Sequence, residues 1–204
     1  MGLGFSMVED VSPGRPSPES RRQQILDAAC ERVRHSGFHG ASMADIAKAA
    51  GLSVGQIYRY FENKEAIIAA IVAQDLAEMR DKFAELESQP GTLVDAIDEH
   101  LPESIDKCFE PGRAALALEV IAEAARNPKV ASIVRSADEQ EREMAMSLME
   151  RSRKPEWTEA EFRARCEAIG LIFDGLLMRG VNHPDLDREA LSHVLRTMVR
   201  QLLT

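Results

Sequence analysis

The stretch SMADIAKAAGLSVGQIYRYF, residues 42–61, decides the fold. Ser42, followed three positions later by Asp45, begins one helix, and Ser53 with Gln56 has the form of a capping box that begins the next. Between them, Gly51 permits the left-handed backbone of a sharp turn. Ala47 is small enough for two helices to cross closely, and Ile57 is placed to fill the space between them. The stretch therefore predicts a helix-turn-helix.

The second helix of this unit, expected from about 54 to 61, carries few apolar residues beyond Ile57 and Phe61. Most of its surface should therefore face outward, with Gln56, Tyr58 and Arg59 exposed. Gln pairs well with adenine and Arg with guanine in the major groove, and a Tyr hydroxyl can bond a phosphate. The pattern is typical of a helix that reads DNA.

Working outward, cap residues and Pro or Gly breaks predict an all-α fold of about nine helices, with no run of alternating β-branched residues that would indicate a sheet. The predicted organisation is a disordered arm over 1–17, a three-helix DNA-binding head over 18–64 and a helical body over 65–204. The expected helices cover about 17–37, 42–51, 53–61, 63–87, 92–108, 113–126, 128–153, 158–180 and 187–204.

Charge divides the chain in the same way. The 204 residues carry a formal net charge of −9, which excludes a uniformly basic coat for nucleic acid. Residues 15–64 nevertheless hold 8 Lys and Arg against 5 Asp and Glu, whereas residues 66–204 hold 17 against 26. A cationic head on an acidic body predicts an anionic partner at one end only.

Other function classes find little support in the sequence. It contains no GxSxG, HExxH, Walker A or GxGxxG motif and no metal-ligand spacing among its five histidines, so we expect no enzyme, cofactor or metal. No apolar run approaches the roughly 18 residues of a membrane span, and no signal peptide is evident, so the expected location is cytoplasmic. Cys30, Cys108 and Cys166 are expected to be free thiols.

Residues 21–68 resemble the TetR family of bacterial transcriptional repressors. The likeness lies in RRQQILDAA and in GFHGASMADIAKAAGLSVGQIYRYFENKEAII. The resemblance implies a homodimer that binds a palindromic double-stranded DNA operator through its head, and a body that receives a small-molecule effector. On this basis a ligand would release a repressor from its operator.

The resemblance also implies roles for individual residues. Val54, Gly55 and Gln56 match positions that approach base edges, while Ser42, Tyr58, Tyr60 and Lys64 match phosphate-contacting positions. Arg59 falls where a base or phosphate contact varies between members. Arg15, Arg21 and Arg22 are expected to add backbone or minor-groove contacts, and the free amides at the Ser42 and Ser53 helix starts favour phosphate oxygens.

The body matches the family by helix count and length rather than by motif. Its last two helices are the usual dimerising pair. The residues expected at the dimer interface are Gly170, Leu171, Phe173, Leu176, Leu177, Leu191, Leu195, Met198 and Leu202. The candidate effector-binding residues are His100, Cys108, Phe109, Glu119, Glu123, Met144, Met149, Phe162 and Phe173. Trp157 lies in a polar connection and is expected to be a surface or staple residue rather than part of a ligand site.

Two alternatives remain open from the sequence. One is a DNA-binding regulator with no small-molecule ligand, controlled by a protein partner or by cysteine oxidation. The other is a helical carrier or scaffold whose head is vestigial. Salt-dependent DNA binding separates the second alternative from a regulator, and Cys→Ser variants test the first.

Overall fold

The computed structural model describes residues 17–204, which form nine α-helices and one short 3₁₀ turn without a strand. The expected all-α fold is thus confirmed for the described part of the chain. Residues 1–16, with most of the predicted disordered arm and Arg15, lie outside the described residues.

The head consists of α1 (Pro18–Gly40), α2 (Met43–Ala49) and α3 (Val54–Ile57). Its helix starts follow the sequence signals closely. The Ser17 hydroxyl accepts a hydrogen bond from the Ser20 amide, and complete capping boxes at Ser42 and Ser53 begin α2 and α3. The expected end of the first helix at Gly37 is a break rather than a stop, because Gly37 has φ 68° and the chain continues helically to Gly40.

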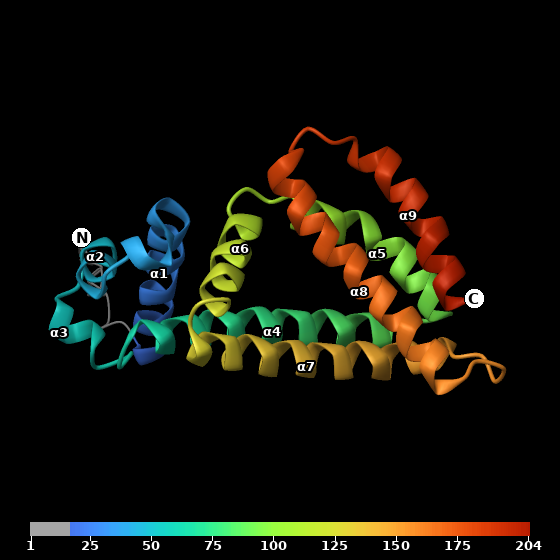
Figure 1. Ribbon diagram of the computed structural model, residues 1–204, viewed down its shortest axis with the longest axis horizontal. Helices are drawn as coiled ribbons and strands as arrows, with labels where there is room; N and C mark the ends of the chain where they lie inside the picture. The colour runs from blue at the N-terminus through green and yellow to red at the C-terminus, as the bar shows by residue number, and fades with distance from the viewer. Residues whose placement is uncertain (1–16) are drawn as a thin grey trace, which may run out of the picture.

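The body begins with the long α4 (Lys64–Ser88), against which α7 (Pro128–Met149) lies along most of its length (Figure 1). α6 (Arg113–Ala124) stands between the head and the rest of the body. At the far end, α5 (Leu93–Cys108), α8 (Glu159–Asn182) and α9 (Arg188–Leu203) pack together. α4 therefore joins the two parts covalently, and α6 joins them by contact.

The hydrophobic core is divided between these regions. The head core includes Ile25, Ala29, Ile46, Ile57 and Phe61, and Ile67 at the start of α4 belongs to the same cluster. A second cluster joins the end of α1 to α4, α6 and α7. Of two further clusters around α5, α8 and α9, one also includes the ends of α4 and α7. The packing inside the head and the packing of the end of α1 against α6 and α7 therefore involve different residues.

The connection between α7 and α8 departs from the sequence expectation at the end of α7. The predicted helix to about 153 ends at Met149, and Glu150–Ser152 forms a 3₁₀ turn. Trp157, expected as a surface or staple residue, is only 7% exposed and shares the largest core cluster with Phe162. Trp157 directly precedes the N-cap Thr158, so this pair has the spacing of a hydrophobic staple rather than a place at the surface. The Arg165 guanidinium, 4.2 Å from the ring centroid, also covers the indole.

Candidate nucleic-acid interface and effector domain

The helix-turn-helix has the geometry that its sequence predicts. Gly51 has φ 64°, the left-handed conformation needed for the turn between α2 and α3. Ala47 is 1% exposed at the crossing of the helices, and Ile57 is completely buried between them. α3 is shorter than expected, however. The Arg59 and Tyr60 amides bond the carbonyls three residues back, which tightens the chain into a turn before Phe61.

This shortened recognition element presents most of its side chains to solvent. Val54 is 40% exposed and Tyr58 is 53% exposed, and Gly55, Gln56 and Arg59 are exposed as well. Tyr60 is half-buried and packs against the head core. Five predicted DNA-contacting residues around the buried Ile57 are thus exposed, and we call them together the reading face: Val54, Gly55, Gln56, Tyr58 and Arg59.

The side chains at the two helix starts are already engaged within the head. The Ser53 amide donates to Gln56 Oε1 (2.8 Å), and the Gln56 amide donates to the Ser53 hydroxyl (3.3 Å). The Ser42 amide and hydroxyl both donate to the Asp45 carboxylate, which lowers the pKa of that carboxyl group. The capping box uses Gln56 Oε1 and leaves the side-chain amide nitrogen available as a hydrogen-bond donor.

Two predicted phosphate contacts instead have clear roles inside the protein. Arg22 donates to the Tyr60 carbonyl (3.3 Å) and lies 4.3 Å from the centre of the Phe61 ring. Lys64 donates to the Phe38 carbonyl (2.9 Å) and lies 4.5 Å from the Phe38 ring centroid. Arg21 donates to Gln24 Oε1 (2.9 Å) on the same helix. The geometry therefore assigns structural contacts to Arg22 and Lys64, whatever they contribute to DNA binding.

The candidate effector residues fall in several places, although Cys108, Phe109 and Phe173 share one core cluster. Met149 and Phe162 lie in the largest core cluster, and Phe173 packs against that cluster and its neighbour. Cys108 and Phe109 lie at the end of α5, and the half-buried Met144 is on α7. His100 lies 3.4 Å from Glu85 of α4.

Glu119 and Glu123 lie on the side of α6 that meets the head rather than in a common site with the others. The Glu119 carboxylate accepts a hydrogen bond from the Phe38 amide (3.3 Å). Glu123 is 3% exposed and lies 3.2 Å from His39 Nδ1. Both carboxylates therefore belong to the contact between α6 and α1.

Sequence reasoning missed a group of carboxylates between α4, α7 and α8. One of them, Glu141, is partly buried. Burial raises the pKa of its carboxyl group, and the nearby Asp75, Asp138 and Asp174 raise it further. Arg113, at the start of α6, pairs with Asp75 (2.5 Å). No local sequence signal could have shown this, because the four acids come from three separate helices.

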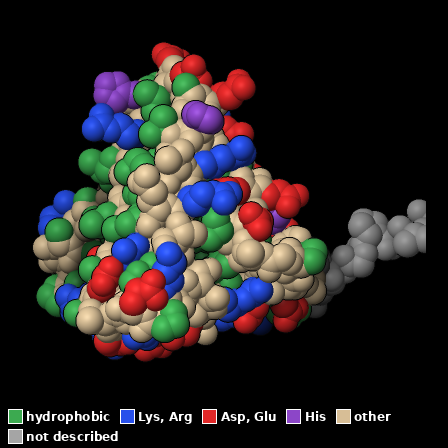
Figure 2. Space-filling model, turned by 90° about the vertical axis from the view of Figure 1, so that its right-hand side faces the viewer, with side chains coloured by type: hydrophobic (Ala, Val, Ile, Leu, Met, Phe, Trp, Pro, Cys, Tyr) green, Lys and Arg blue, Asp and Glu red, His purple; other side chains and the backbone are tan. Residues whose placement is uncertain are grey.

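At the α8 and α9 end, the predicted dimer residues divide by exposure. Leu171 is 64% exposed and Met198 is 44% exposed, while a Cβ added at Gly170 or Gly175 would meet nothing within 4 Å. Leu176 and Leu195 are buried within the chain's own core, and Phe173, Leu177, Leu191 and Leu202 are half-buried. Met178, Val181 and Val194 are further exposed apolar residues there that sequence reasoning did not select. Figure 2 views this end and shows hydrophobic side chains reaching the surface among charged ones.

The described residues contain no group of three or more His, Cys, Asp or Glu side chains placed to hold a metal ion. None of the helices in residues 17–204 is both long enough and apolar enough to cross a membrane. The three cysteines are free, and burial raises the pKa of each thiol. A higher thiol pKa lowers the reactive thiolate fraction at neutral pH, which disfavours redox sensing.

A small helix-turn-helix head with an exposed reading face, carried on a larger helical body, defines a DNA-binding regulator. Comparison with known families agrees. The model described as "Bacterial regulatory proteins, tetR family" matches residues 25–71, and "BetI-type transcriptional repressor, C-terminal" matches residues 92–204, more than half of the chain. The chain belongs to the TetR family of transcriptional regulators, as the sequence resemblance predicted.

Individual relatives extend the likeness over nearly the whole chain. The HTH-type transcriptional regulator UidR of Escherichia coli K12 is 32% identical over 185 residues, covering 90% of this chain and 93% of UidR. The structure of Salmonella enterica GusR superposes with a TM-score of 0.76 at 27% identity, covering 92% of this chain and 97% of GusR. Bacillus subtilis FadR, solved in complex with stearoyl-CoA, has the same fold with a TM-score of 0.73 at 20% identity, covering 87% and 96%.

Proposed function

We propose that this regulator is a dimeric repressor that binds a palindromic operator and is released by a small molecule bound in its body. The observation that carries the proposal is the reading face, where Gln56, Tyr58 and Arg59 are exposed around the buried Ile57. Side chains of these types suit base edges and phosphates in a major groove. Two such heads in a symmetric dimer would contact successive major grooves, about 34 Å apart.

The exposed apolar surface of α8 and α9 supports the dimer. Leu171 and Met178 lie seven residues apart on α8, and Val194 and Met198 lie four residues apart on α9. These spacings place each pair on one side of its helix, so the two helices offer adjoining apolar stripes. A second copy would remove these side chains from water, in a self-complementary contact typical of two-fold dimers.

Control by a small molecule is supported by the family and by the division of the fold. The FadR structure with stearoyl-CoA belongs to the same fold. In this chain, α6 contacts the head through Glu119 and Glu123, while its first residue, Arg113, pairs with Asp75 and Glu78 of α4 in the body. An effector that shifts α6 would therefore change the position of the head. To release DNA, it must bind the shifted state more tightly than the DNA-binding state.

A linkage experiment tests this proposal. A panel of metabolites is screened for compounds that raise the thermal unfolding temperature of the purified protein. Each compound found is then titrated into protein bound to a fluorescent operator duplex. We expect the compound to weaken operator binding by the same factor by which the operator weakens binding of the compound. A compound that stabilises the protein but leaves operator affinity unchanged would contradict release by an effector.

No structural observation favours the alternative of cysteine control. Cys30 and Cys108 are partly buried and Cys166 is buried, and each thiol pKa is raised. The scaffold alternative is also disfavoured, because the reading face retains exposed polar side chains instead of a closed surface.

A further inference from the structure

The end of α1 is held by two elements at a single residue, Phe38. Its amide donates to Glu119 Oε2 on α6 (3.3 Å), and its carbonyl accepts from Lys64 Nζ at the start of α4 (2.9 Å). Its ring is 6% exposed in the cluster that joins the head to the body. We call Phe38, Lys64 and Glu119 the Phe38 junction.

The backbone is adapted to this contact. Gly37 has φ 68° and ψ 167°, so helical geometry is interrupted one residue before Phe38 and the Phe38 amide is free to point at α6. A Cβ at Gly37 would lie 3.2 Å from Glu119 Oε2 and at a strained φ, so glycine allows both the turn and the close approach.

A second carboxylate strengthens the same contact one helical turn further along α6. Glu123 is 3% exposed, lies 3.2 Å from His39 Nδ1 and accepts a hydrogen bond from Asn127 (3.2 Å). Asn127 also donates to Glu65 of α4 (3.4 Å). Glu119 and Glu123 thus both contact the segment that follows the Gly37 break. Phe38 links Glu119 to Lys64, and Asn127 links Glu123 to Glu65, the second residue of α4.

The other attachments of the head to the body are mainly apolar. The chain continues into α4 through Phe61 and Asn63, and Val33, Phe38 and Ala41 at the end of α1 pack with residues of α4, α6 and α7. The Glu119 hydrogen bond adds a directional contact to this apolar packing, so its loss should widen the range of head orientations while the head keeps its internal fold. In a dimer, a change of head orientation alters the distance and angle between the two reading faces without changing either face.

Building on the proposed function, we propose that Glu119 is a positioning residue that sets which half-site spacing the dimer accepts. It acts through the Phe38 amide and contacts no DNA. Moving one half-site by one base pair shifts it by about 3.4 Å and rotates it by about 34°. A head whose orientation is fixed by directional polar contacts should tolerate such a change poorly, whereas a head held by apolar packing alone should tolerate it better.

The test uses the full-length protein and inverted-repeat duplexes that share the same half-sites but differ in spacer length by one base pair. For the unaltered protein we expect the affinity for DNA to fall at least about ten-fold when the spacer is one base pair shorter or longer than the best one. A ten-fold change in affinity corresponds to the free energy of about one hydrogen bond to a charged group. For Glu119→Ala we expect the fall to shrink to less than about three-fold, with base preference within each half-site unchanged. Glu119→Gln keeps an acceptor for the Phe38 amide and should retain the original spacing profile.

Glu143→Ala, at an exposed carboxylate on α7, is the matched control and should behave like the unaltered protein. Hydrogen exchange gives a readout that does not require DNA: the Phe38 amide should exchange faster in Glu119→Ala, while amides of the head core stay protected. An unchanged spacing profile in Glu119→Ala would overturn this inference and leave the proposed function standing. A loss of base preference in Glu119→Ala would also overturn it, because it would mean that Glu119 is needed to fold the head. If the unaltered protein showed no preferred spacing, the proposed dimeric operator binding would fail, and the spacing role with it.

Discussion

At the scale of single residues, the reading face contains side chains of two kinds: those suited to a base edge and those suited to a phosphate. Tyr58 is half exposed and presents one hydroxyl. We therefore expect Tyr58→Phe to weaken binding about three- to ten-fold on all duplex sequences, as expected for losing one hydrogen bond. Fluorescence anisotropy on a panel of single-base operator variants measures this.

Gln56 should behave differently on the same panel. Gln56→Ala removes the exposed side chain that is expected to read a base, so we expect preference at one base pair to fall by about 10-fold or more while other positions are unaffected. The substitution also removes the Oε1 acceptor of the Ser53 capping box, at a cost of about 0.5–1 kcal/mol in head stability. If both variants lost affinity equally on every sequence, the separate roles of Tyr58 and Gln56 would be wrong.

At the scale of helices, the carboxylates between α4, α7 and α8 make stability depend on pH. The pKa values of Glu141 and Asp174 are both raised, first by burial and then by neighbouring acids. A carboxyl group whose folded pKa is raised destabilises the fold once it ionises, so this penalty grows as pH rises through the folded pKa and is absent below the unfolded pKa. We expect Glu141→Gln to raise the unfolding temperature at pH 7–8 and to have no effect near pH 4.

Exposed Glu143 on the same helix provides the control for that measurement. Glu143→Gln should change the unfolding temperature little at any pH. A Glu141→Gln variant that is less stable than the unaltered protein at pH 8 would show that ionised Glu141 is stabilised by a partner rather than penalised by its surroundings.

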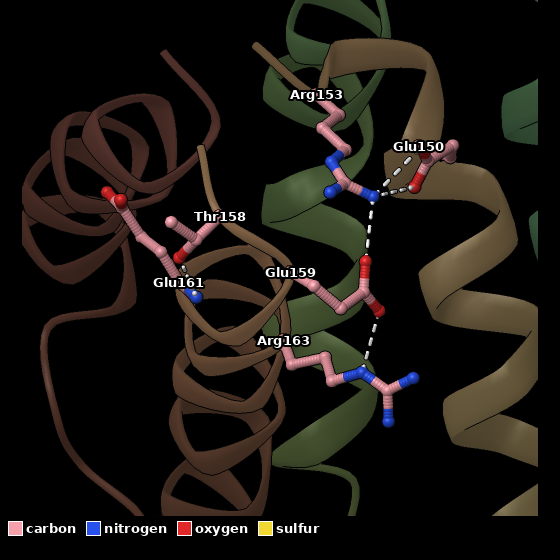
Figure 3. Close-up of polar contacts among 6 residues, drawn as sticks. All are labelled: Glu150, Arg153, Thr158, Glu159, Glu161 and Arg163. Atoms are coloured by element: carbon pink, nitrogen blue, oxygen red, sulfur yellow. Dashed lines mark hydrogen bonds and ion pairs between the residues drawn. The ribbon is translucent and has the colours of Figure 1, made fainter. Parts of the chain in front are cut away.

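Two arginines near the start of α8, Arg163 and Arg165, differ in what they contact, so their contributions to stability can be compared. Arg165 covers Trp157 and donates to the Gln201 and Leu202 carbonyls at the end of α9, besides pairing with Glu161. Arg163 pairs with Glu159 on the exposed surface, where Glu159 also binds Arg153 (Figure 3). We expect Arg165→Ala to cost about 1–3 kcal/mol and Arg163→Ala about 0.3–0.5 kcal/mol.

Thermal unfolding distinguishes these two outcomes, since about 1 kcal/mol shifts the unfolding temperature of a chain of this size by roughly 2–4 °C. Faster hydrogen exchange in the last turn of α9 should accompany Arg165→Ala only. Equal effects of the two substitutions would mean that Arg165 does not hold α9.

The same elements explain how much could be predicted from sequence. Caps and breaks are local, so the starts at Ser42, Ser53 and Thr158 could be read directly. The end of α3 was placed too late because bonding three residues back has no clear sequence signal. Burial of Trp157 and Glu141, and the partners of Glu119, arise from contacts between distant helices. The effector residues remain predictions for the same reason, since the body carries no local motif.

At the scale of the whole molecule, the account requires two copies. The exposed apolar residues of α8 and α9 should form the contact between the two copies. Leu171→Glu would then bury one unpaired carboxylate from each copy in an apolar interface. We expect this variant to be monomeric by sedimentation equilibrium at concentrations where the unaltered protein is a dimer. Ile121→Glu, at a residue 55% exposed on α6, is the control and should remain dimeric. A dimeric Leu171→Glu would place the interface elsewhere.

The central claim is that two linked reading faces recognise a symmetric DNA sequence. Its most direct test is selection of binders from a pool of random duplex DNA by the purified full-length protein at two salt concentrations. The account predicts enrichment of one inverted repeat at both concentrations, since base contacts add specificity to the salt-dependent phosphate contacts. Weak binding that disappears at the higher salt concentration, with no enriched sequence, would contradict it.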